Sequence, residues 1–195
     1  MTTKSKGITL SVEIDDNPIN PREDYEHFGK MICWHRRYDL GDKNPYKKSQ
    51  DFWDDKELQD NIFVKLNVYM MDHSGLSFSA NPFTTDPQNW DSGQIGIIYA
   101  TEADTIKEFG DLSEDSRLEA EKLLASEIAE YNDYHTSNYY RFSIEGLEGE
   151  VVDSCGGFRG DTMQEVLESM QVVADRGYDF LFEKILEKQQ GAEMY

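Results

Sequence analysis

The amino-acid sequence predicts an α+β fold, with an antiparallel or mixed sheet of about five or six strands and two or three helices from the C-terminal half on one face. Three observations predict this class. Short segments of alternating apolar and polar residues, typical of half-buried strands, recur through the N-terminal half. Two of these segments are joined by a turn sequence, which favours a hairpin connection. Helical spacing of apolar residues begins only after residue 113.

The predicted domain spans residues 8–190, because a chain of 195 residues suits one domain with a full core. Residues 1–7 are polar, and we expect them to be disordered. The first strand is expected over residues 8–14, where isoleucine, leucine and valine alternate with polar residues.

A second strand is expected over residues 30–38. Alternation places Met31 and Cys33 on one side of this strand. Ile32 and Trp34 then lie on the other side. The polar, glycine-bearing segment that follows is expected to be loop.

The next three elements are a helix, a hairpin and a strand. Residues 51–61 favour a short helix, with Asp51 as a candidate cap. Residues 62–83 form the clearest hairpin of the sequence, since two alternating segments flank the turn sequence DHSG, in which Gly75 can take a positive φ. Residues 94–100 are continuously apolar, as is typical of a central strand.

Residues 113–134 have the apolar spacing of a long helix, with Ser113 or Asp115 as its N-cap. The remaining elements are two strands, at residues 138–146 and 150–155, and two helices, beginning at Asp161 and at Tyr178. Gly177 is predicted to end the first of these helices as a C′ glycine.

The net charge of −20 excludes broad binding to a phosphate backbone, which depends on lysine and arginine. We therefore expect no direct DNA binding and no attraction to anionic membranes, but attraction to basic proteins. The two cysteines are too few for a disulfide framework. The sequence has neither a signal-peptide pattern nor an apolar run of about 18 residues. These features predict a protein of the cytoplasm with reduced thiols.

Charge is distributed unevenly along the chain. Residues 102–133 carry a net charge of −8 and residues 51–60 a net charge of −4, whereas residues 30–48 carry +4. One hypothesis is an acidic surface that imitates nucleic-acid phosphates and binds a basic groove. The alternative is a solvated helix face that keeps the protein soluble. The candidate partner-binding residues are Asp51, Asp54, Asp55, Glu57, Asp111, Glu114, Asp115 and Glu119.

The segment EVVDSCGGFRGDTMQE, residues 150–165, places a glycine-rich loop between a strand and a helix. Such a loop can hold a phosphate on free N–H groups. However, the segment matches neither GxxxxGK[ST] nor GxGxxG, and Asp161 at the cap would repel an anion. We interpret it as a turn and a helix cap.

Four residues are weak candidates for zinc ligands: Cys33, His35, His73 and Cys155. Their spacing contains no CxxC or HxxxH pair, so structural cysteines and a turn histidine are the simpler interpretation. A cysteine nucleophile with a histidine base is possible by residue type, but no spacing supports it. We predict no catalytic residue and no cofactor.

Four segments together carry a family resemblance: NPREDYEHFGKMICWHRRYDLGDK, YMMDHSG, NPFTTDPQNWDSGQIGIIYAT and EVVDSCGGFRGD. Over about residues 8–175 the chain resembles an uncharacterised family of bacteriophage and mobile-element accessory proteins. The resemblance implies an accessory protein that acts in the cytoplasm of a bacterial host. It carries over no catalytic residue.

Two hypotheses from different classes follow. The first is a non-enzymatic protein that binds a basic, nucleic-acid-handling host protein and inhibits a defence nuclease, as an anti-restriction or anti-CRISPR protein. The second is a small metal- or phosphate-binding enzyme. Its site would lie at the loops that contain Cys33 and His35, His73, Trp90–Gly93 and Cys155–Gly160. A virion component that self-assembles is a third possibility.

Overall fold

The computed structural model describes residues 1–24 and 26–192, apart from the side chains of residues 24 and 189–192. The fold is α+β, as predicted, but the strands form two antiparallel sheets of four strands each. Whereas the sequence predicts one domain over residues 8–190, contacts divide the chain into two compact units. The first unit joins Met1–Ile19 to the chain from Ser137 onward, and the second is Asn20–Thr136. Each unit has its own buried apolar core, which is the physical reason for the division.

The sheet of the first unit has the strand order β1-β2-β7-β8. Its strands are β1 (Thr2–Ser5), β2 (Ile8–Ile14), β7 (Tyr140–Glu145) and β8 (Val151–Phe158). The prediction of disorder over residues 1–7 is wrong, because β1 pairs with β2 and Thr3 is buried opposite Leu10. Lys6 and Gly7 both have positive φ, 51° and 83°, as a two-residue hairpin loop requires.

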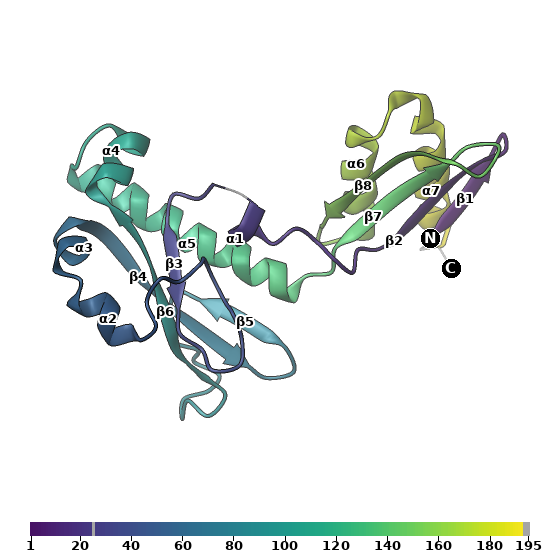
Figure 1. Ribbon diagram of the computed structural model, residues 1–195. Coiled ribbons are helices and arrows are strands. Elements are labelled where there is room, and N and C mark those ends of the chain that lie inside the picture. The colour runs from purple at the N-terminus through teal and green to yellow at the C-terminus, as the bar shows by residue number, and fades with distance from the viewer. Residues whose placement is uncertain (25, 193–195) are drawn as a thin grey trace. The chain divides into compact units, whose positions relative to one another are not determined.

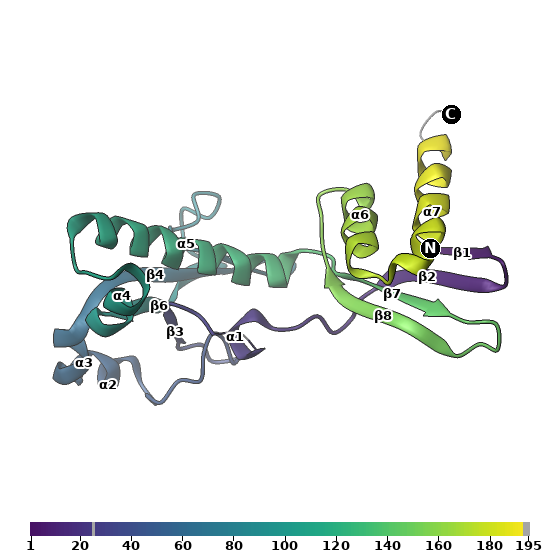
Figure 2. The same cartoon turned by 90° about the horizontal axis from the view of Figure 1, so that it is seen from above.

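Helices α6 (Met163–Val173) and α7 (Asp179–Ala192) cover one face of this sheet (Figure 2). Their buried side chains pack on alternating residues of β2 and β7: Leu10, Val12, Phe142 and Ile144 against Val166, Leu167, Met170, Leu181, Phe182 and Ile185. Gly177 does not end α6 as predicted. Ala174 takes an extended conformation and ends the helix, and Gly177 lies in the 3-10 helix η1 (Arg176–Tyr178).

The sheet of the second unit has the order β3-β6-β4-β5. Its strands are β3 (Lys30–Cys33), β4 (Ile62–Asp72), β5 (Leu76–Ser79) and β6 (Ser92–Thr101). Its helices are α1 (Pro21–Asp24), α2 (Ser49–Asp54), α3 (Lys56–Asn61), α4 (Glu102–Phe109) and α5 (Glu114–Thr136). The predicted hairpin is confirmed as β4 and β5, with Gly75 at a φ of 144°. The predicted helix over residues 51–61 is two helices, because Asp55 ends α2 and caps α3.

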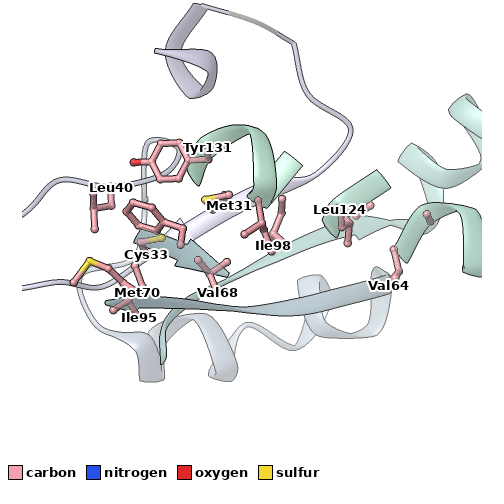
Figure 3. Close-up of a cluster of buried hydrophobic side chains, with 14 residues drawn as sticks. Met31, Cys33, Leu40, Val64, Val68, Met70, Ile95, Ile98, Leu124 and Tyr131 are labelled. Atoms are coloured by element: carbon pink, nitrogen blue, oxygen red, sulfur yellow. The ribbon is translucent and has the colours of Figure 1, made fainter. Parts of the chain in front are cut away.

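Both faces of this second sheet are covered. One face packs on α5, which runs along the strands (Figure 1), and Figure 3 shows Leu124 and Tyr131 of that helix above Val64 and Val68. Phe52 of α2 packs on the other face. The central strand β6 is therefore buried on both sides, which explains the continuous apolar run of residues 94–100.

A buried ion network joins the start of the unit to α5. Glu127 is only 6% exposed, and its carboxylate accepts hydrogen bonds from the backbone N–H groups of Phe28 (2.9 Å) and Gly29 (3.1 Å). The Arg22 guanidinium donates to Glu127 (2.9 Å) and to both carboxylate oxygens of Asp42 (2.8 and 2.6 Å). Glu127 thus belongs to the interior, although the sequence places it in an acidic helix.

Candidate functional site: an acidic end of the residue 20–136 unit

Strand pairing in the second unit brings two acidic segments together. Ile62, the first residue of β4, pairs with Thr101, the last residue of β6. Helix α3 ends immediately before β4, and α4 begins immediately after β6. The two helices therefore lie at the same end of the sheet, as both ribbon views show (Figures 1 and 2).

The first turns of α5 lie at this end as well. The Arg117 guanidinium donates to the carbonyl oxygen of Phe63 at 2.6 Å and lies over the Phe63 ring at 4.2 Å from its centroid. Because Phe63 is the second residue of β4, this contact places Glu114 and Asp115 beside the start of that strand.

We define the acidic end as the carboxylates of α3, α4 and the start of α5, together with Asp55, which caps α3, and Asp111, which lies between α4 and α5. They are Asp55, Glu57, Asp60, Glu102, Asp104, Glu108, Asp111, Glu114 and Asp115. All are exposed except the half-buried Asp55. Two predicted residues, Asp51 and Asp54, lie on α2, which directly precedes α3. Glu119 lies further along α5 and pairs with Lys122 at 2.6 Å.

Local hydrogen bonds hold three of these carboxylates in place. Asp55 accepts from the backbone N–H of Leu58 (3.1 Å) at the N-cap of α3. Asp104 accepts from the Thr101 hydroxyl (2.6 Å) in the capping box of α4. Asp111 accepts from the backbone N–H of Ser113 (2.9 Å) and from the Ser116 hydroxyl (2.5 Å).

Hydrogen bonding to the charged form also lowers two pKa values at this end. The hydroxyls of Ser116 and Ser113 lower the pKa of Asp111 to about 2. The Leu58 N–H, followed by the Tyr46 hydroxyl, lowers the pKa of Asp55. The negative charges of Asp55 and Asp111 are therefore held in position and persist to lower pH than that of an ordinary aspartate. Such an exposed array attracts cationic surfaces.

A hollow of about 490 Å³ opens at the acidic end, between α3, the end of β6 and the start of α4. Its lining includes Lys30, Tyr46, Asp55, Glu57, Leu58, Asn61, Tyr99, Thr101 and Ala103. Tyr99 is 5% exposed, and its ring packs on Phe52 with a centroid distance of 5.7 Å. Burial, followed by the charges of Asp104 and two further aspartates, raises the pKa of the Tyr99 hydroxyl.

Three of the four glycine-bearing loops meet at the opposite end of the same sheet. Arg37 forms an ion pair with Asp72, and the Asp72 N–H donates to the carbonyl oxygen of Asp91 (2.8 Å). His73 Nδ1 lies 3.1 Å from a carboxylate oxygen of Asp91. His35 stacks on a neighbouring tyrosine ring with a centroid distance of 5.1 Å. The fourth predicted loop is not a loop at Cys155, which lies in strand β8 of the other unit.

The weak zinc candidates are not brought together as a ligand set. Among the side chains that the structure describes, no group of three His, Cys, Asp or Glu is placed to hold a metal ion. Cys33 is buried in the core beneath α5, and burial, followed by the charge of Asp42, raises the pKa of its thiol to about 12. A thiol in this state is a poor ligand and a poor nucleophile.

The glycine-rich segment is not the predicted turn, because residues 155–158 continue strand β8 (Val151–Phe158) and pair with β7; a helix cap follows at Thr162. The N–H of Gly157, at a φ of 81°, donates to the Asp15 carboxylate (2.9 Å). The predicted cap Asp161 is replaced by its neighbour, because the Thr162 hydroxyl accepts from the Glu165 N–H at 3.2 Å. The Asp161 N–H itself donates to the Glu165 carboxylate (2.9 Å). Protein carboxylates thus occupy N–H groups that a phosphate would need.

Comparisons of this chain with protein-family models, curated proteins and solved structures find no match. In the described ranges, no helix combines the length and the apolar character needed to cross a membrane.

Proposed function

We propose that this protein is a non-enzymatic acidic binding protein, and that the acidic end engages a basic, nucleic-acid-handling host protein. One observation carries the proposal: the pairing of Ile62 with Thr101 joins two acidic segments, distant in sequence, on one exposed surface. Without this pairing, each segment is an ordinary solvated helix.

Binding would proceed by electrostatic competition. Proteins that hold DNA or RNA neutralise phosphates with lysine and arginine. The carboxylates of the acidic end, three of which are held by local hydrogen bonds, would present a negative array to such a basic groove and exclude the nucleic acid from it. The resemblance to mobile-element accessory proteins makes a host defence nuclease, targeted in anti-restriction or anti-CRISPR fashion, the partner we propose.

The experiment begins with a pull-down from host lysate at low and at high salt, which identifies the partner that salt releases. Two variants with the same change in net charge then test the surface. The test variant reverses four exposed carboxylates of the acidic end: D60K, E102K, E108K and D115K. The control variant reverses four exposed carboxylates of the other unit: D16K, E145K, E183K and E187K.

We expect the test variant to slow association with the partner at least about tenfold at low salt, and to lose inhibition of nucleic-acid binding. The control variant should retain both, although its net charge is equally changed. Equal effects of the two variants would show that net charge alone matters, and would overturn the proposed surface. Retention of binding by the test variant would overturn it as well.

A further inference from the structure

We propose that the hollow beside Tyr99 receives an arginine side chain of the basic partner. This inference rests on the proposed function and names the chemical group that the acidic end recognises. Its volume of about 490 Å³ is within the range of about 300–1,000 Å³ typical of specific ligand pockets. It could therefore take one side chain as an anchor, with the surrounding carboxylates as a rim.

Tyr99 points to a ligand in this hollow. The tyrosine is 5% exposed, and it lines the hollow from the central strand β6. Among the hydrogen bonds of the described residues, none involves the Tyr99 hydroxyl. The ring of Tyr99 is buried, but its hydroxyl is not among the fully buried polar atoms, so it reaches the hollow and can bond a group that enters from outside.

The polar groups of the hollow are rich in acceptors. Asp55 and Glu57 contribute carboxylates. The NH₂ group of the Asn61 side chain donates to the carbonyl oxygen of Glu57 (2.7 Å), which leaves the Asn61 amide oxygen as an acceptor for a ligand. The Tyr46 hydroxyl already donates to Asp55 (2.8 Å), so it is left as an acceptor. A guanidinium has five N–H donors and no acceptor, and it therefore complements this lining.

The charges and the rings favour the same group. Asp55 and Glu57 outweigh Lys30, the single cation of the lining, and Asp104 also acts on Tyr99. A phosphate would meet these carboxylates at short range and is disfavoured. The planar guanidinium stacks on aromatic rings and binds carboxylates through two parallel hydrogen bonds, which a lysine ammonium does not.

The test titrates the full-length protein with N-acetyl-arginine amide and follows backbone amide NMR signals. N-acetyl-citrulline amide has the same shape without the charge, and N-acetyl-lysine amide has the charge without the planar group. We expect saturable shifts at Asn61 and Ala103 with the arginine derivative alone. The variant Y99F keeps the ring and should weaken this binding about tenfold or more, because a hydrogen bond to a charged group is lost.

The matched control is Y69F, which removes a tyrosine hydroxyl of β4 outside the hollow. It should bind the arginine derivative like the wild type. Absence of binding to the wild type, equal binding of the citrulline or lysine derivative, or unchanged binding by Y99F would each overturn the inference.

The two proposals fail separately. The D60K, E102K, E108K and D115K substitutions all lie outside the lining of the hollow. Loss of partner binding in that variant, together with no arginine binding by the wild type, would retain the acidic surface and reject the hollow. Arginine binding together with an unaffected charge-reversal variant would reject the proposed surface instead.

Discussion

The substitution of Glu127 by glutamine should destabilise the residue 20–136 unit by about 3 kcal/mol. Removing one partner of a buried ion pair costs about 3–5 kcal/mol, because the remaining charge is left uncompensated in the interior. Arg22 keeps Asp42 in this variant, which places the effect at the low end of that range. The glutamine NH₂ group also replaces a carboxylate oxygen that, in the wild type, accepts a hydrogen bond from the backbone N–H of Phe28 or Gly29.

Urea unfolding followed by tryptophan fluorescence measures this effect in one unit. All three tryptophans, Trp34, Trp53 and Trp90, belong to residues 20–136, so their emission reports that unit. With a urea dependence of about 1–3 kcal/mol per molar, a loss of about 3 kcal/mol lowers the midpoint by about 1–3 M.

The matched control is E130Q, which changes an exposed carboxylate of the same helix. Its effect should stay within about 0.5 kcal/mol, as is usual for surface substitutions. If E127Q and E130Q unfolded at the same urea concentration, the reasoning would be refuted, since the buried network would then add nothing to stability.

Two further predictions concern a thiol and a carboxylate. A thiol reagent should modify the half-buried Cys155 in the native protein but modify Cys33 only on unfolding, because burial raises the pKa of Cys33 to about 12. Mass spectrometry maps the modified cysteines. Rapid modification of both in the native protein would contradict the prediction. The folded pKa of Asp111, about 2, is below its ordinary value of 3.8, so its contribution to stability is present above pH 3.8 and is lost as pH falls through about 2. D111N should therefore flatten the acid dependence of tryptophan-detected unfolding in that window. The control D60N, which changes an exposed carboxylate, should not. Equal slopes in the two variants would argue against the Ser113 and Ser116 contacts.

Local periodicity was sufficient for many elements. This holds for the strand over residues 8–14, the hairpin from residue 62 and the long helix from residue 113. In each strand or helix the regularly spaced apolar residues lie on one face, so the local pattern alone predicts the element. Helix α4 was missed, because its eight residues are too short for a clear helical pattern and bury only Thr105. β1 was missed because a four-residue polar strand gains its stability from pairing and has little apolar signal of its own.

The sequence by itself determined the fold class, the excess of carboxylates and the two segments that carry most of it. Only the tertiary structure decided which carboxylates share a surface, because the pairing of β4 with β6 is a long-range contact that no local pattern encodes. It also decided that Glu127 is interior while Glu130, three residues later, is exposed. The local sequence does not distinguish a buried glutamate from an exposed one. The burial of Glu127 depends on Arg22 and on backbone N–H groups about one hundred residues away in the chain.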